Sequence, residues 1–323
     1  MTSTNVVVRG ARRARAILRS RLYYGLLWNV LLRSRAKARH RACVAAADHS
    51  DAHTYTAFYR SPPQLAALTG PVVDHVTASG RDEVSILILA ASNGAEAYTI
   101  ASELIARRPE LAFSITASDL HEATVAQGIA ACYTLEEITQ GQDVPAEFIE
   151  RTFDRIGDLY RVKEHIRSHV TFVQADLLDP ALNEQFDPAD IVLAQNVLFH
   201  MPADLARRAF ANIIGLLRPG AVLLIEGMDL DQRVELTRAA GLEPMRLQTR
   251  QIHRYARRHL AANWWDYYYG CEPYFALARD RSRRYGTIFV DANQSERATA
   301  SAIATQRSTQ EWSTRSGVSS STW

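Results

Sequence analysis

Residues 85–105 constrain the fold more than any other part of the chain. They begin with a short continuous apolar run at 86–89, which is typical of a strand buried on both faces of a sheet. The small residues 90–94 follow, so the backbone can turn sharply there and approach a ligand closely. The spacing of apolar residues over 96–107 then predicts a helix. A buried strand that leads through a tight turn into a helix is a typical first unit of an α/β sheet.

The next expected strand, residues 113–118, is followed directly by Asp119. An acidic residue at the end of a second strand, beside a small-residue turn, is typical of a nucleoside site. The turn admits the ligand and the carboxylate accepts hydrogen bonds from ribose hydroxyls. Small-residue turns also occur for packing, and an Asp at a strand end is often a helix cap. The sequence leaves both interpretations open at this point.

Strands and helices continue to alternate along the chain. Strands are expected at residues 86–89, 113–118, 170–173, 190–194, 221–225, 245–248 and 274–278. Helices are expected at residues 96–107, 121–132, 203–217 and 231–240, and residues 133–168 are expected to be mostly helical or irregular. This alternation predicts an α/β fold with a Rossmann-like, doubly wound, mostly parallel sheet.

Polar residues follow several of the expected strands. Asp119 follows the second strand, Asp176 the third, and Gln195 and Asn196 the fourth. In a doubly wound sheet these strand ends line one crevice, where ligands bind. The chain has neither the lysine-bearing phosphate loop of nucleotide hydrolases nor a Ser-His-Asp elbow. A nucleoside without phosphates therefore fits best, and S-adenosyl-L-methionine is the most common cofactor of that kind.

Composition limits the class of protein. The 323 residues carry a formal net charge of +2, which does not favour a nucleic-acid partner. The three cysteines show no paired spacing, so we expect no disulfide framework, no cysteine-rich zinc site and a reducing, cytoplasmic location. The apolar run at residues 22–32 is too short to span a bilayer, so a soluble protein is expected.

The chain divides into three parts. Residues 1–50 are predicted to form a basic helical extension, 51–285 the α/β domain, and 286–323 a disordered tail rich in Ser and Thr. Residues 9–41 include many arginines and no Asp or Glu. We favour an accessory helix packed on the core. The alternatives are a membrane-surface anchor, a site for an anionic partner, and a targeting segment.

An ordered set of motifs carries a family resemblance. The motifs lie at residues 56–60, 90–101, 117–119, 160–163, 170–178, 196–197, 217–220 and 274–280. Together they resemble the CheR-type chemotaxis-receptor methyltransferases, which use S-adenosyl-L-methionine. The resemblance spans roughly residues 52–280. It implies a methyltransferase domain at 51–285 with the seven-stranded class I methyltransferase fold.

The resemblance also implies the residues of the cofactor site. They are Thr56, Arg60 and Glu96 at the methionine end, Ala90 and Gly94 in the turn, Asp119 at the ribose, Asp176 and Leu177 at the adenine, and Asn196 and Val197 near the acceptor pocket. No metal ligand is predicted.

Some positions depart from the family pattern. Ala95 and Ala97 stand where the family has Glu and Pro, and His200 stands where it has an active-site Tyr. Residues 227–230 read Gly-Met-Asp-Leu in place of Gly-His-Ser-Glu. The family's N-terminal helical domain and its small receptor-docking insertion are not recognisable. The resemblance therefore implies the cofactor, whereas receptor glutamate is not favoured as the substrate.

The acceptor determines which side chains the reaction needs. A carboxylate acceptor is already ionised and needs only a group such as Arg60 to orient it. A hydroxyl or ammonium acceptor must lose a proton, a task that suits the imidazole of His200. We predict methyl transfer to an O or N acceptor on a small molecule or protein side chain, with His200 and Arg60 as catalytic residues. An equal alternative is that His200 only stacks or hydrogen-bonds at the pocket lip.

Other functions remain open alongside this prediction. One is a catalytically inactive, cofactor-binding regulatory or scaffold protein, and another is a protein-glutamate methyltransferase as in the chemotaxis family. A nucleic-acid methyltransferase is least favoured, because no Asn/Asp-Pro-Pro-aromatic motif follows the fourth strand. The aromatic residues within 264–269 are expected to pack as a local core, the alternative being that they stack on an acceptor.

Overall fold

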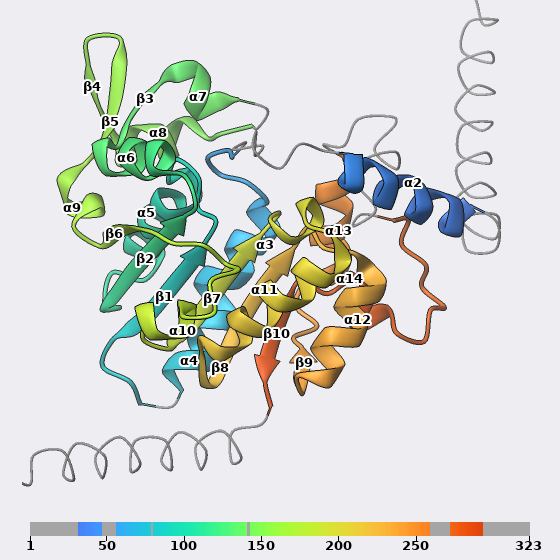
Figure 1. Ribbon diagram of the computed structural model, residues 1–323. Helices are drawn as coiled ribbons and strands as arrows, with labels where there is room; N and C mark the ends of the chain where they lie inside the picture. The colour runs from blue at the N-terminus through green and yellow to red at the C-terminus, as the bar shows by residue number, and fades with distance from the viewer. Residues whose placement is uncertain (1–31, 47–55, 79, 141–142, 259–271, 293–323) are drawn as a thin grey trace, which may run out of the picture.

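The computed structural model describes residues 32–46, 56–78, 80–140, 143–258 and 272–292. Its centre is a seven-stranded sheet in the order β6-β2-β1-β7-β8-β10-β9 (Figure 1). The strands are β1 (Val84–Leu89), β2 (Phe113–Asp119), β6 (Val170–Gln174), β7 (Ala189–Gln195), β8 (Leu217–Glu226), β9 (Leu242–Pro244) and β10 (Ile288–Asp291). The pairs from β6 to β8 are parallel, and β10 is antiparallel to both of its neighbours. The predicted Rossmann-like, mostly parallel class I methyltransferase sheet is confirmed.

Alternate side chains of the central strand β1 enter two separate cores. Ile86 and Ile88 belong to one apolar cluster, and Leu87 and Leu89 belong to the other. Helices α3 (Pro62–Ala67), α4 (Val73–Thr77), α5 (Ala95–Arg107) and α13 (Thr249–Arg258) pack on the first face, and α10 (Leu182–Gln185), α11 (Ala203–Gly215) and α12 (Leu230–Ala239) pack on the second. Burial on both faces explains why β1 and β7 contain continuous apolar runs. No helix in the described ranges is long and apolar enough to cross a membrane.

Residues 132–162 contain a second sheet that the sequence did not predict. Its antiparallel strands are β3 (Cys132–Thr134), β5 (Leu159–Val162) and β4 (Phe153–Ile156), in that order. Helices α7 (Leu135–Thr139) and α8 (Ala146–Thr152) lie against it, whereas α6 (Glu122–Ala130) packs on β2 and β6 of the main sheet and α9 (Glu164–Arg167) packs on α5 (Figure 1). The expectation of helical or irregular structure was therefore incomplete. Strands of three or four residues, with exposed apolar side chains such as Ile156 and Leu159, carry too little periodicity to be recognised.

The C-terminal strands differ from the predicted ones. The strand expected at 245–248 lies earlier, as β9, and residues 274–278 form no strand. The last strand is β10, inside the segment that was expected to be a disordered tail. Ile288 and Phe289 are buried between β8 and β9, so this short apolar run has enough contact to order. Residues 293–323 and the aromatic cluster at 264–269 lie outside the described residues.

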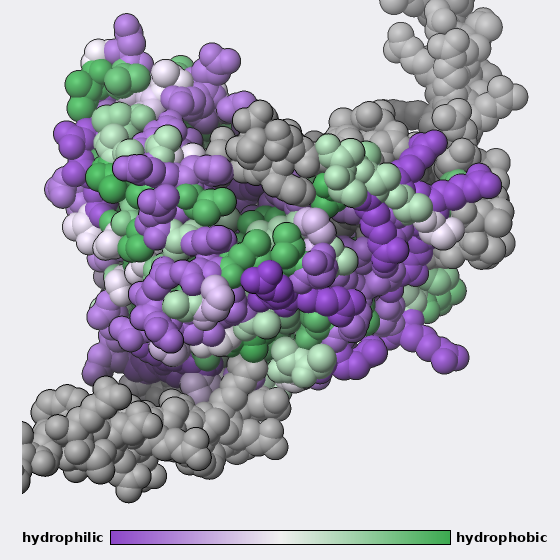
Figure 2. Space-filling view, in the orientation of Figure 1, coloured by the Kyte–Doolittle hydropathy of each residue, from purple (hydrophilic) through white to green (hydrophobic). Residues whose placement is uncertain are grey.

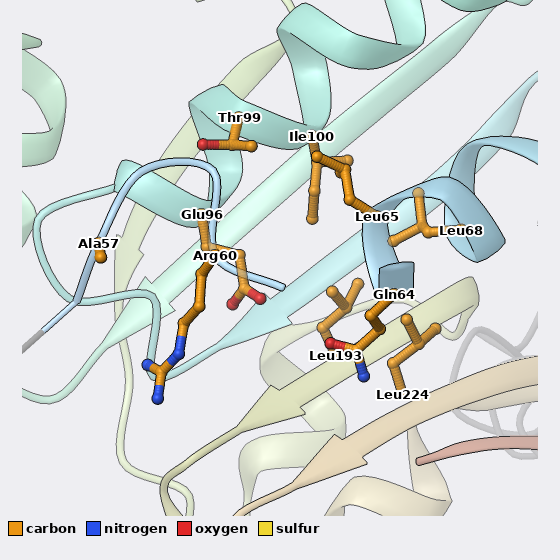
Figure 3. A pocket seen from close by; sticks show the side chains of 10 residues that line it. All are labelled: Ala57, Arg60, Gln64, Leu65, Leu68, Glu96, Thr99, Ile100, Leu193 and Leu224. Carbon is orange, nitrogen blue, oxygen red and sulfur yellow. The ribbon is translucent and has the colours of Figure 1, made fainter. Parts of the chain in front are cut away.

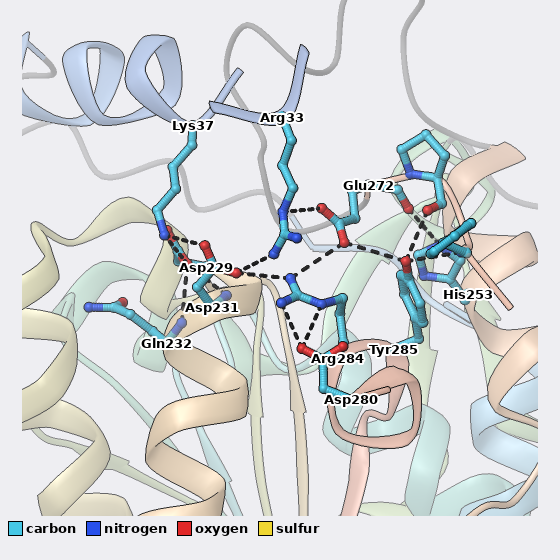
Figure 4. Close-up of polar contacts among 12 residues, drawn as sticks. Arg33, Lys37, Asp229, Asp231, Gln232, His253, Glu272, Asp280, Arg284 and Tyr285 are labelled. Atoms are coloured by element: carbon cyan, nitrogen blue, oxygen red, sulfur yellow. Dashed lines mark hydrogen bonds and ion pairs between the residues drawn. The ribbon is translucent and has the colours of Figure 1, made fainter. Parts of the chain in front are cut away.

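The described part of the N-terminal extension is α2 (Arg33–Ala46). Arg33 and Lys37 form ion pairs with Asp231 at the start of α12, and Lys37 also pairs with Asp229 (Figure 4). These ion pairs attach the described part of the extension to α12, and the segment at 1–31 lies outside the description. In the orientation of Figure 1, hydrophilic residues cover most of the visible surface of the described protein, and apolar side chains lie in small, separate groups (Figure 2).

Candidate functional site

The turn between β1 and α5 has a strained backbone. Ala90, Ser92 and Gly94 have φ angles of 56°, 51° and 87°, in the left-handed region that side chains disfavour. Non-glycine residues keep this conformation only where the surroundings fix it, and such positions cluster at functional sites. Gly94 is also required by space, because a Cβ there would lie 2.6 Å from Cζ of Phe172. The predicted small-residue turn is therefore a close-fitting loop.

The carboxylate of Asp119 holds this turn. Its Oδ2 accepts a 2.7 Å hydrogen bond from the backbone nitrogen of Ser92. Its Oδ1 lies 3.1 Å from the backbone nitrogen of His121 and 2.9 Å from the hydroxyl of Thr124, at the start of α6. Asp119 thus has the structural role that was open from the sequence. A carboxylate oxygen has two lone pairs, so Oδ2 retains one for a ribose hydroxyl.

A pocket lies beside the turn, between α3, α5 and the strands β7 and β8 (Figure 3). Its lining consists of Ala57, Arg60, Gln64, Leu65, Leu68, Glu96, Thr99, Ile100, Leu193 and Leu224. Most of these side chains are apolar. The two charged ones, Arg60 and Glu96, lie side by side in Figure 3. A mostly apolar pocket with a few convergent polar groups is typical of a small-molecule site.

Arg60 and Glu96 carry opposite charges, and the described residues supply no direct partner for either side chain. Neither side chain makes a hydrogen bond or ion pair to another described residue. Burial raises the pKa of Glu96 to about 7, against the lowering effect of Arg60 and with a further rise from Glu226. Burial also raises the pKa of Glu226, against Arg60 and Arg233. Titratable groups shifted in this way inside a cleft are candidates for ligand contact.

The ends of β7 and β8 meet next to this pocket. Gln195 and Glu226 are register partners, and the backbone nitrogen of Asn196 donates a 2.9 Å hydrogen bond to the oxygen of Glu226. Asn196 has a φ of 53°, and a Cβ on Gly227 would lie 2.5 Å from its Cα. The glycine retained in the altered 227–230 motif therefore allows the two strand ends to touch.

Sequence analysis placed Gln195 among the strand ends that line the crevice but gave it no cofactor or catalytic role, and it did not place Glu226, which ends the next strand, in the site. The position of Glu226 at the end of an expected strand could have indicated the site, because the carboxyl ends of neighbouring parallel strands meet at one edge of a sheet. It was missed because no sequence motif specifies which residues of β7 and β8 face each other. Gln195 is 9% exposed, yet neither its amide nitrogen nor its amide oxygen has a hydrogen-bond partner in the part of the chain that the structure describes.

The residues predicted at the adenine follow β6. Asp176 is exposed, and its Oδ1 accepts a 2.8 Å hydrogen bond from the backbone nitrogen of Leu178. The Leu177 side chain is buried in the second apolar core. Asp176 therefore presents a carboxylate to solvent at the same sheet edge as Asp119, with one oxygen unengaged by described residues.

Three other predicted residues lie around the pocket in different ways. Thr56 lines a separate polar pocket with Ser92 and Thr124, so the structure does not bring it together with the Arg60 pocket. Val197 is half-buried and packs against the second core. His200 ends the short helical turn Leu198–His200, with its ring centroid 3.8 Å from that of Phe199, and is not among the described lining residues of the Arg60 pocket.

The residues present fit S-adenosyl-L-methionine. The methionine part carries one carboxylate and one ammonium group, which match the charges of Arg60 and Glu96. The ribose matches the remaining lone pair on Asp119, and the adenine matches the exposed Asp176. The free polar groups and the left-handed turn are thus accounted for by one ligand without phosphates.

Comparison with known proteins identifies relatives of the chain. It is 29% identical over 172 residues to the probable biofilm formation methyltransferase WspC of Pseudomonas putida, covering 53% of this chain and 40% of that one. It is 25% identical over 175 residues to chemotaxis protein methyltransferase 2 of Vibrio cholerae, covering 53% and 60%. The chain therefore spans less than two thirds of the length of these relatives.

A solved structure is also similar in part. An O-methyltransferase family protein from Burkholderia thailandensis matches 79% of this chain and 64% of that one, with 21% identity and a TM-score of 0.33. Residues 54–235, more than half of the chain, match the family described as the CheR methyltransferase, SAM binding domain. The chain belongs to the CheR methyltransferase family, whose domain here comprises the cofactor turn, the Arg60 pocket and the ends of the parallel strands.

Proposed function

We propose that the protein is an S-adenosyl-L-methionine-dependent methyltransferase that acts on an O or N acceptor of a small molecule or protein side chain. The observation that carries the proposal is the Arg60 and Glu96 pair beside the strained turn that Asp119 holds. Two opposite charges that form no hydrogen bond to a described residue, next to a carboxylate with a spare lone pair, fit a zwitterionic nucleoside better than they fit packing. Family membership supports the same cofactor.

The chain's own residues position the reactants. When bound, the cofactor would supply a methyl group to the acceptor: the acceptor's lone pair would bond to the methyl carbon as the bond from that carbon to the positively charged sulfur breaks, in line. Arg60 would bind the methionine carboxylate, Glu96 the ammonium and Asp119 the ribose. Apolar residues such as Leu193 and Leu224 exclude water from the pocket. His200 is our candidate for the group that receives the acceptor's proton.

Calorimetric titration with S-adenosyl-L-methionine and with its demethylated product, S-adenosylhomocysteine, tests the cofactor site. We expect saturable binding of both ligands. Asp176→Ala removes an exposed carboxylate at the predicted adenine contact, and Asp187→Ala is the matched control, because that carboxylate is exposed and outside the site. The first variant should bind more weakly and the second should match the unaltered protein. No binding by the folded, unaltered protein would contradict the proposal.

Protein-glutamate methylation is a second candidate, favoured by a named relative in the chemotaxis class. Arg60 would then orient the acceptor carboxylate. The products distinguish the candidates, since a glutamyl methyl ester releases methanol in base whereas a methylated amine does not. Cofactor binding without turnover on any acceptor would instead favour a regulatory role.

The proposal extends to partners and location. Arg35 and Arg41 are exposed on α2, on the part of the basic segment 9–41 that is described. They support contact with an anionic partner or membrane surface. We also place the protein in the cytoplasm, because the cysteines have no paired spacing and the cofactor is an intracellular metabolite.

A further inference from the structure

Gln195 and Glu226 face one another across the last parallel strand pair at its carboxyl end. Side chains alternate along a strand, so Gln195 shares a sheet face with Leu193, and Glu226 shares it with Leu224. Leu193 and Leu224 are both lining residues of the pocket that contains Arg60. The two polar side chains therefore lie one step beyond the apolar part of the pocket, toward the edge where ligands bind.

The side-chain amide of Gln195 is buried and lacks hydrogen bonds to the described residues. Both of its polar atoms are buried without a hydrogen-bond partner among the described residues. Burying a polar group without a partner is unfavourable, so an unpartnered amide in a native structure calls for a specific reason. A ligand that both donates to and accepts from this amide supplies one.

The carboxylate of Glu226 is in a similar position. Its backbone oxygen is engaged by Asn196, but its carboxylate makes no hydrogen bond or ion pair to any described residue. Arg60 acts on both Glu226 and Glu96, Arg233 acts on Glu226 as well, and both carboxylates are desolvated. Once the cofactor's carboxylate occupies Arg60 and its ammonium occupies Glu96, the Glu226 carboxylate still has no hydrogen-bond partner among the described residues.

We propose that Glu226 and Gln195 form the acceptor subsite and select an amine as the methyl acceptor. This inference rests on the proposed function and deepens it. The Glu226 carboxylate accepts a hydrogen bond from the acceptor's N–H group, and the Gln195 amide completes the set of contacts. A carboxylate acceptor would bring a second negative charge against Glu226 in a desolvated site and is disfavoured by repulsion.

A cofactor analogue provides a test that does not require the acceptor to be known. In sinefungin, a carbon bearing an amine replaces the methylated sulfur, so its ammonium occupies the direction in which the methyl group leaves. S-adenosylhomocysteine has the same nucleoside and methionine groups but lacks this ammonium. The ratio of the two dissociation constants therefore reports the charge at the acceptor end alone.

We expect the unaltered protein to bind sinefungin at least about tenfold more tightly than S-adenosylhomocysteine, as for a charge-assisted hydrogen bond. Glu226→Gln keeps the shape of the side chain and should abolish most of this preference while changing S-adenosylhomocysteine binding less than about threefold. Glu96→Gln should weaken both ligands alike, because both carry the methionine ammonium. Glu184→Gln, at an exposed carboxylate on α10, should change neither.

Gln195→Met provides a second, independent variant, because Gln195 has no protein hydrogen bond to lose. We expect this variant to weaken the binding of sinefungin more than the binding of S-adenosylhomocysteine. Equal affinity of the unaltered protein for the two ligands would overturn the inference, as would an equal loss of both in Glu226→Gln. Failure of the unaltered protein to bind either ligand would remove the proposed function, and the inference with it.

Discussion

The hydroxyl of Tyr133 donates a 2.6 Å hydrogen bond to the backbone oxygen of Asn93. This contact joins the inserted sheet, through β3, to the cofactor turn between β1 and α5. Tyr133 is fully buried, and Phe58 and Phe153 pack against its ring. The insertion is therefore a support for the left-handed turn and not only an appendage at the end of the main sheet.

Tyr133→Phe should distinguish the effect of the Tyr133 hydrogen bond from the effect of the packed ring. The ring remains, but the turn loses one buried hydrogen bond, so we expect the free energy of unfolding to fall by about 0.5–1.5 kcal/mol. Binding of S-adenosylhomocysteine should weaken as well, because the turn is less constrained. Both changes are measured by denaturant unfolding and calorimetry.

Tyr160→Phe is the control for that experiment. Tyr160 is the register partner of Tyr133 in the same sheet, but its hydroxyl makes no hydrogen bond to a described residue. Tyr160→Phe should therefore leave the free energy of unfolding and the binding of S-adenosylhomocysteine unchanged. If the two variants behave alike, the Tyr133 hydroxyl does not support the turn.

The sequence predicted those parts of the fold that local patterns specify. The central strand β1 contains a continuous apolar run, and the turn at 90–94 is a run of small residues. Asp119 was found because it directly follows an expected strand. Its two interpretations could not be separated from the sequence, because its partners Ser92 and Thr124 are brought to it only by folding.

The remaining parts depend on contacts between distant residues. The strand β10 is four residues long and is ordered by β8 and β9, which precede it by many residues. The pairing of Gln195 with Glu226 depends on the register of two strands, which no local pattern reveals. The same limit applies to the inserted sheet, whose strands are too short to show a period.

Gly94→Ala should be destabilising for two reasons. The φ of 87° disfavours any side chain, and the added Cβ would meet the ring of Phe172. We expect a loss of at least about 1 kcal/mol in the free energy of unfolding and weaker cofactor binding. Gly157→Ala separates the two causes, since Gly157 has a φ of 64° and no atom within 4 Å of an added Cβ. A loss no larger at Gly94 than at Gly157 would show that the contact with Phe172 carries no cost.

Cofactor binding should depend on pH through Glu96. The ammonium of the ligand requires an ionised Glu96, whose pKa in the free protein is about 7. Affinity should therefore fall as the pH is lowered below 7, by up to about tenfold per pH unit. Glu96→Gln should remove this dependence and bind weakly throughout. Calorimetry from pH 5.5 to 8 in matched buffers measures it, and a flat profile for the unaltered protein would contradict the assignment.

Glu96 should also make the free energy of unfolding depend on pH, in the direction opposite to that for cofactor binding. Between the ordinary pKa of 4.5 and about 7, the unliganded native state holds a proton on Glu96 that the unfolded chain has released. The contribution of Glu96 to the free energy of unfolding therefore decreases as the pH rises through this window. Unfolding of Glu96→Gln alongside the unaltered protein isolates this contribution, which should be absent in the variant.

The attachment of α2 should depend on Asp231. Burial alone would raise the pKa of this carboxyl, but the hydrogen bond from Lys37 and the charges of Arg33 and Arg284 outweigh it and hold the pKa at about 2. A lowered pKa means that the stabilisation is present above the ordinary value of 3.8 and is lost as the pH falls through about 2. Because Asp231 is 38% exposed, solvent screens these pairs.

We therefore expect Asp231→Asn to lower the free energy of unfolding by only about 1 kcal/mol at neutral pH and low salt, and less at high salt. Proteolysis within residues 33–46 should become faster, because α2 loses its ion pairs with α12. Asp74→Asn is the control. Asp74 lies on α4 and forms an ion pair with Arg108 at the surface, with no contact to α2 among the described residues, so its loss should not affect proteolysis there. If both variants are cleaved at the unaltered rate, these ion pairs do not hold α2 on the domain.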